Sequence, residues 1–203
     1  MEPVTDTLPP KDAVTSVPVH PLIAQRWSPR ALRTDIALTA EDLRPLLEAA
    51  RWAASSGNTQ PSRFLVGLRG DETFDRIRDS LVPGNENWAR NAGALIAGLV
   101  ITENEKGPLD AAEYGLGLAV ANLVLEGVHH GIVAHQMRGF EHDKLRAAFD
   151  LPATVRTVVV IALGHLDGPE ALGERLAARE CAPRTRIELS ELAFTGEYGT
   201  ALY

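Results

Sequence analysis

The sequence predicts an α+β protein in which helices surround a mainly antiparallel sheet. The order of the predicted elements indicates this class, and the length and composition indicate the size of the domain. Stretches with helical spacing of apolar residues mix irregularly with short apolar, β-branched runs, and no strict βαβ repeat is present. In addition, the 203 residues, of which 45% are hydrophobic and 23% charged, suffice for one domain with a substantial core.

The ordered part of the chain is expected to begin near residue 20. Residues 1–19 hold four prolines and show no apolar periodicity, which indicates a mobile tail. Residues 20–203 contain no repeat and no low-complexity tract, so we expect a single domain there.

The first convincing helix is predicted to start at Thr39, whose hydroxyl can cap it. Glu41 and Asp42 fill the first turn, where acids interact favourably with the helix dipole. Pro45 lies near that predicted start, where a missing N–H costs less than it would in the middle of a helix. The helical pattern ends at 55–58, where Ser, Gly and Asn indicate a loop.

The later elements are assigned by the same periodicity. Strands are predicted at 63–68, 94–102, 131–136 and 155–163. Helices are predicted at 71–81, 110–130 and 142–149, with a helical stretch near 169–179. Small residues lie on several faces of the 110–130 helix, so it suits close packing, including packing at a dimer interface.

Charge and composition exclude several kinds of protein. The net charge of −7 argues against a general binder of nucleic acid or acidic membranes. The single cysteine, Cys181, excludes an internal disulfide and a cysteine metal cluster, and no His or acidic residues have metal-ligand spacing. There is no signal-peptide pattern, and the longest apolar run, 92–101, is too short to span a membrane. We therefore expect a cytoplasmic protein.

Two basic clusters could hold an anion. Arg26-Trp27-Ser28-Pro29-Arg30 places a hydroxyl between two guanidinium groups, which suits a phosphate. In Pro183-Arg184-Thr185-Arg186, the alternating arginines of an extended segment face the same side. Taken alone, each cluster is more often a solvated basic stretch.

Two polar segments could contact a heteroaromatic ring. Ser55-Ser56-Gly57-Asn58-Thr59-Gln60-Pro61 offers hydroxyls and amides in a loop between a helix and a strand. Gln136-Met137-Arg138-Gly139-Phe140 follows a predicted strand, and its glycine allows a ring edge to approach the backbone. Taken alone, these segments are more often an ordinary loop and an ordinary turn.

In order and content, the four clusters together resemble the FMN-dependent nitroreductase family from Arg26 to Arg186. The most specific part is Glu-Ala-Ala-Arg-Trp-Ala-Ala-Ser-Ser-Gly-Asn-Thr-Gln-Pro at 48–61, followed by Arg-x-Ser-x-Arg at 26–30. The resemblance implies a nitroreductase-like fold and a homodimer with FMN at its interface. It also implies that the C-terminal segments embrace the partner.

The resemblance also assigns roles. Arg26, Ser28 and Arg30 would hold the phosphate, ribityl chain and pyrimidine edge of FMN, and Arg184 and Arg186 would clamp the phosphate. The 55–60 loop would face flavin bound mainly by the other subunit, and the backbone N–H groups of Arg138 and Gly139 would lie near flavin N5. The implied cofactor-binding residues are Arg26, Trp27, Ser28, Arg30, Ser55, Ser56, Asn58, Gln60, Gln136, Met137, Arg138, Gly139, Arg184 and Arg186.

By this resemblance the chain would use NADH or NADPH to reduce a nitroaromatic or quinone by a ping-pong mechanism, with FMN and no side chain carrying the chemistry. The physiological acceptor and the choice of nicotinamide stay open. Alternatives are a flavin-binding sensor or storage protein, a dehalogenase-like or flavin-consuming relative, and a cofactor-free interaction module. Arg138 stands where relatives often have a small residue or Glu, so its side chain could reach a substrate.

Overall fold

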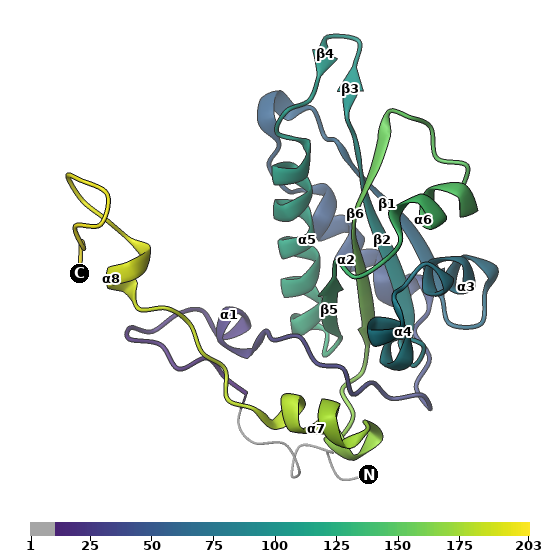
Figure 1. Ribbon diagram of the computed structural model, residues 1–203, viewed down its shortest axis with the longest axis horizontal. Coiled ribbons are helices and arrows are strands. Elements are labelled where there is room, and N and C mark those ends of the chain that lie inside the picture. Colours follow the sequence, from purple (N-terminus) through teal and green to yellow (C-terminus); the bar gives the residue numbers. More distant parts are fainter. Residues whose placement is uncertain (1–10) are drawn as a thin grey trace.

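The computed structural model describes residues 11–203, so the predicted tail is described only from residue 11 onward. Within this part of the chain, four strands form an antiparallel sheet in the order β1-β2-β6-β5 (Figure 1). These strands are β1 (Ser62–Leu68), β2 (Ala94–Ile101), β5 (Val133–Met137) and β6 (Val155–Gly164). The expected α+β class with a mainly antiparallel sheet is confirmed.

Helices cover both faces of the sheet. On one face lie α2 (Ala40–Arg51) and α5 (Ala112–His129), and on the other lie α3 (Glu72–Asp79), α4 (Pro83–Ala89) and α6 (His142–Ala148). Alternate residues of β2 enter the two cores, with Ile96 on the α5 side and Leu95 on the α3 side. Because β2 is buried on both faces, its sequence is continuously apolar.

The predicted start of α2 is confirmed by a capping box. The Thr39 hydroxyl accepts a hydrogen bond from Asp42 N, and the Asp42 carboxylate accepts one from Thr39 N. The placement of Pro45 near the helix start was wrong, because α2 begins at Ala40 and Pro45 is an interior residue. The helix loses the hydrogen bond to the Glu41 carbonyl there, and buried Leu43 and Leu46 hold it against the core instead.

Several short elements carry too few residues for a periodic signal. They are α1 (Pro21–Gln25), the turn η2 (Ser56–Asn58), and the hairpin strands β3 (Glu103–Asn104) and β4 (Gly107–Pro108). The helical stretch predicted near 169–179 divides into the short turn η3 (Pro169–Ala171) and a helix that begins at Glu174. The sequence also did not predict α4, which turns its last residues, Trp88 and Ala89, into the core.

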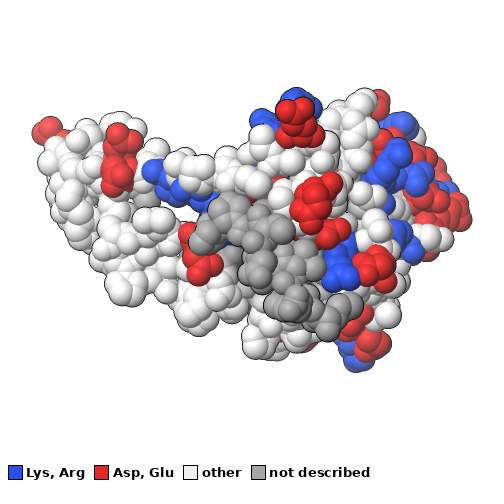
Figure 2. Space-filling model, turned by 90° about the horizontal axis from the view of Figure 1, so that it is seen from below, with Lys and Arg blue, Asp and Glu red and all other residues white. Residues whose placement is uncertain are grey.

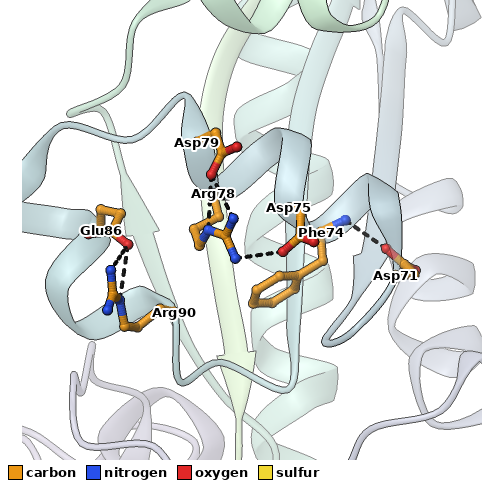
Figure 3. Close-up of polar contacts among 7 residues, drawn as sticks. All are labelled: Asp71, Phe74, Asp75, Arg78, Asp79, Glu86 and Arg90. Carbon is orange, nitrogen blue, oxygen red and sulfur yellow. Dashed lines mark hydrogen bonds and ion pairs between the residues drawn. The ribbon is translucent and has the colours of Figure 1, made fainter.

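The outer faces of α3 and α4 carry ion pairs between near neighbours in the sequence (Figure 3). Arg78 contacts Asp75 at 2.6 Å and Asp79 at 2.7 Å, and Arg90 pairs with Glu86. Such solvated pairs contribute about 0–1 kcal/mol each, so this charged surface needs no functional explanation.

The chain ends in an arm that leaves the body. After α7 (Glu174–Cys181), residues 182–203, here called the C-terminal arm, run outward and include α8 (Leu189–Leu192) (Figure 1). Apolar side chains on the arm are exposed, including Leu192 at 64% and Tyr198 at 95%. Among residues 11–203, no helix combines the length and apolarity needed to cross a membrane.

Candidate functional site

A cavity of about 230 Å³ lies where the segment before residue 31 meets α7 and the base of the C-terminal arm. Among the described residues that line it, the cations are Lys11, Arg26, Arg30, Arg179, Arg184 and Arg186, and the acid is Glu180. Ser28 and Trp27 complete the first predicted cluster. Figure 2 shows blue side chains at the narrow connection between the body and the C-terminal arm. The two predicted basic clusters, which are far apart in sequence, therefore line one cavity. We call it the basic cavity.

A buried carboxylate fixes the first basic segment to α7. Glu180 is 1% exposed, and its Oε1 accepts hydrogen bonds from Arg30 N at 2.7 Å and Ala31 N at 3.0 Å. Its Oε2 has no hydrogen-bond partner among the described residues and lies 3.9 Å from Nη1 of Arg30. Glu180 thus orients the backbone that carries Arg30 and supplies negative charge among the surrounding cations.

A histidine joins the same segment to the edge strand of the sheet. His135, on β5, contacts the Pro29 carbonyl through Nδ1 at 2.9 Å and packs against Trp88 with ring centroids 4.6 Å apart. Burial, followed by the charge of Arg30, lowers the pKa of His135 to about 4. The ring is therefore neutral at pH 7, and Nδ1 donates because a carbonyl can only accept.

The cations crowd one another in the basic cavity. Burial, and then the charges of Arg184 and Arg186, lower the pKa of Arg26. Burial likewise lowers the pKa of Arg30, where Glu180 opposes the shift and Arg179 adds to it. Arginine remains charged at pH 7, so these shifts report repulsion and lost solvation that a bound anion would relieve.

The segment from Gln136 to Gly139 comprises the end of β5 and the two residues that follow it, and it begins directly after His135. Arg138 and Gln136 line a second cavity of about 200 Å³, with Val158, Val159 and one face of α5. Met137 points the other way, into the core. Outside helices and strands, no backbone hydrogen bond within residues 11–203 uses the N–H of Arg138 or Gly139.

Close packing holds this segment in place. The Gly139 carbonyl accepts hydrogen bonds from Asn85 Nδ2 at 3.0 Å and from Val82 N at 3.2 Å. A Cβ at Gly139 would come within 2.6 Å of Asn85 Nδ2, so a larger residue here would displace the Asn85 side chain from its contact with the Gly139 carbonyl. Asn85 and His135 are thus supporting residues that the sequence did not reveal, because each acts through a contact distant in sequence.

The polar segment that begins at Ser55 lies elsewhere. The 55–60 loop lines a third cavity, of about 210 Å³, between α2, β1 and the N-terminal part of α5, where Gly115 faces Pro61 and Ser55. The loop is tightly folded, with positive φ at Gly57, Asn58 and Gln60. In Figure 1, α1 and α7 lie toward the opposite end of α5 from this loop. An 18-residue helix is about 27 Å long, so Ser55, Ser56, Asn58 and Gln60 do not line the basic cavity of their own chain.

Sequence reasoning missed Lys11, Arg179 and Glu180 in the basic cavity. Lys11 fell within the predicted tail, Arg179 fell at the end of a helical stretch with an ordinary mixture of charges, and Glu180 followed it directly. One signal was available for the last two, since they precede the Pro183–Arg186 cluster by only a few residues.

Comparison with known proteins agrees with this architecture. The family model described as the nitroreductase family matches residues 23–86. An uncharacterized 15.4 kDa protein of Mycolicibacterium smegmatis is 38% identical over 148 residues, which cover 69% of this chain and 99% of that protein.

Solved structures extend the similarity over nearly the whole chain. An oxidoreductase containing FMN is 31% identical with a TM-score of 0.86, covering 91% of this chain and 95% of its own. A structure from Desulfovibrio desulfuricans in complex with FMN is 27% identical with a TM-score of 0.71, covering 91% and 99%.

The antiparallel sheet, the helices on its two faces and the position of the basic segments define a nitroreductase-like fold. The chain belongs to the nitroreductase family.

Proposed function

We propose that the protein is an FMN-dependent oxidoreductase that uses NADH or NADPH to reduce a small electron-poor acceptor of the nitroaromatic or quinone class. The observation that carries the proposal is the convergence of arginines from two distant segments on one cavity beside β5. Two structures similar to this chain contain FMN, which supports the choice of cofactor.

The donors present fit the two ends of FMN. A phosphate monoester matches Arg26, Arg184 and Arg186, because guanidinium groups bind phosphate oxygens with charge-assisted hydrogen bonds. The backbone N–H groups of Arg138 and Gly139 have no backbone acceptor in the described residues, and they suit the polar edge of a ring. FMN is favoured over FAD because the sequence has no dinucleotide fingerprint to hold an adenylate.

We further propose that the working unit is a homodimer. The 55–60 loop lies away from the basic cavity of its own chain, so a second copy would have to bring this loop to the flavin. The exposed apolar residues of the C-terminal arm provide surface for such a contact. A symmetric pair would form two equivalent sites.

When bound, FMN supplies hydride acceptance and donation. The chain's residues bind and orient FMN, and the positive charges of Arg26 and Arg30 stabilise negative charge on the bound flavin. No side chain need transfer a proton. Because nicotinamide and acceptor would use one site in turn, we expect ping-pong kinetics.

The decisive experiment is the visible spectrum of the purified protein before and after anaerobic addition of NADH or NADPH. We expect a flavin spectrum that bleaches and then recovers when a quinone is added. Heat release followed by chromatography should yield FMN. A flavin that stays oxidised with both nicotinamides would indicate a sensor or storage protein, and a protein that stays colourless after soaking in FMN would refute the proposal.

A further inference from the structure

Residues 11–13, here called the N-terminal strap, lie against the basic cavity. Nη1 of Arg184 donates hydrogen bonds to the carbonyls of Lys11 at 2.5 Å and Ala24 at 2.7 Å. Ala13 N donates to the same Ala24 carbonyl at 2.9 Å. The strap is therefore tied both to the last residues of α1 and to the base of the C-terminal arm.

The Lys11 ammonium is held at the cavity from two sides. Its Nζ donates to the Ala182 carbonyl at 2.6 Å and lies 5.0 Å from the centroid of the Trp27 ring. A lysine ammonium has three donor hydrogens, and the Ala182 carbonyl takes one of them. The other two hydrogens are available to a ligand in the cavity, which Lys11 lines together with Arg26 and Arg186.

Charge indicates what kind of ligand this arrangement takes. The described lining of the cavity carries the Lys11 ammonium in addition to five guanidinium groups, against the one carboxylate of Glu180. Gathering these cations is unfavourable without an anion, because burial and mutual repulsion both act against the charged forms. A dianion offsets more of this repulsion than a single negative charge does.

We propose that Lys11 is a direct ligand of the anion in the basic cavity, and that this anion is the dianionic phosphate of a phosphate monoester. The identity of the monoester as FMN rests on the proposed function, whereas binding of phosphate itself does not. Arg184 then has two tasks, since its Nη1 holds the strap and the residue also lines the cavity.

The first test uses inorganic phosphate as the probe on flavin-free protein. We compare the full chain with Lys11→Met, which keeps an apolar stem against Trp27 and removes the charge. The matched control is Lys106→Met, in the turn between β3 and β4. Thermal unfolding at increasing phosphate concentration and constant ionic strength should give a dissociation constant about three- to tenfold higher for Lys11→Met, as expected for one partly solvated charge-assisted bond. Lys106→Met should match the unmodified protein.

The second test compares FMN with riboflavin, which lacks the phosphate. Lys11→Met should weaken FMN binding by the same factor and leave riboflavin binding unchanged. Equal weakening of both flavins, or no effect on phosphate and FMN, would overturn the role of Lys11.

The two proposals fail differently. If phosphate binds with the Lys11 dependence while neither flavin binds, the anion site stands and the flavin function is lost. If FMN binds and turns over equally well in Lys11→Met, the flavin function stands and the Lys11 site is refuted.

Discussion

At the scale of single residues, Glu180 shows how an acid can support an anion site. Its Oε1 accepts hydrogen bonds from the backbone N–H groups of Arg30 and Ala31 and so fixes the segment that begins with Arg26. Without it, the buried Ala31 N–H and the partly buried Arg30 N–H lose their acceptor, and leaving a buried donor unpaired costs about 1–3 kcal/mol. Glu180 is therefore a positioning residue.

The variants Glu180→Ala and Glu180→Gln separate this role from charge. The alanine variant should lower the free energy of unfolding by about 2–4 kcal/mol, from two unpaired donors, and weaken FMN binding at least tenfold. The glutamine variant keeps a carbonyl oxygen for both donors, so its FMN affinity should stay within about threefold of the unmodified protein. Urea unfolding and FMN titration of the apoprotein measure the two effects. Equal losses of FMN affinity in both variants would show that charge, and not the acceptor, is what the site requires.

Arg138 is expected to act on substrates and not on the cofactor. Its exposed side chain lines the cavity next to α5 and forms no hydrogen bond or ion pair with another side chain in residues 11–203. A guanidinium at an apolar rim favours an anionic or carbonyl-bearing acceptor, or the phosphates of a nicotinamide cofactor.

Arg138→Ala should retain bound FMN and raise KM about three- to tenfold for one of the two substrates, as expected for a partly solvated charged contact. Arg44→Ala, on the exposed face of α2, is the control for removing an arginine. Steady-state kinetics with both nicotinamides and several acceptors is the measurement. Wild-type KM values for all of them would leave only the backbone of this segment with a role.

At the scale of elements, Arg69 ties together segments that the sheet does not connect. Its guanidinium donates to the carbonyls of Thr34 at 2.9 Å, Ile36 at 3.0 Å and Asn91 at 3.0 Å. These carbonyls lie on the segment that follows the first basic cluster and on the turn that enters β2.

Arg69→Met should therefore lower the free energy of unfolding by about 2–4 kcal/mol, because several backbone acceptors lose a charged donor together. Arg76→Met removes a half-exposed arginine of α3 that pairs with Glu72 and lies over the Phe149 ring, and it should change stability by about 1 kcal/mol or less. Urea denaturation of both variants gives the comparison. A loss no larger in Arg69→Met than in Arg76→Met would show that water replaces the guanidinium at these carbonyls.

Sequence reasoning succeeded where local pattern and burial agree. The apolar run of β2 and the Thr39 cap of α2 follow from residues next to each other in the chain, and the structure contains both. It missed α4, whose Trp88 and Ala89 are too few for a periodic signal. Only the family resemblance predicted that the two basic clusters lie together, because no local pattern in the sequence relates Arg26 to Arg184.

The supporting residues of the site could not be predicted from the sequence either, because no local pattern marks them. Glu180 and His135 are defined by bonds to backbone atoms more than 100 positions away in the sequence. Lys11 lies in a proline-containing stretch without periodicity, and its contacts are with Ala182 and Arg184 at the other end of the chain. Only the tertiary structure brings Lys11 and Glu180 to the basic cavity and His135 to the segment that carries Arg30.

At the scale of the whole molecule, the C-terminal arm is the feature that a single chain does not explain. It carries exposed apolar residues, with Leu189 39% and Leu192 64% exposed, on a segment that extends from the body (Figure 1). Water-exposed leucines on an extended arm are unfavourable unless another surface covers them. In the proposed homodimer, each arm would cover its leucines against the partner.

Leu192→Lys should then disrupt the dimer. Burying one leucine contributes about 1.5–3 kcal/mol, and a symmetric pair loses the contact twice. The dimer dissociation constant should rise about 10²- to 10⁴-fold, with FMN lost as the protomers separate. Val14→Lys places the same charge on an exposed valine outside the arm and should leave the dimer dissociation constant unchanged. Light scattering and flavin absorbance, recorded together over a range of protein concentrations, measure both. A Leu192→Lys protein that stays dimeric, or that becomes monomeric with its full content of FMN, would separate the arm from cofactor binding and contradict a shared site.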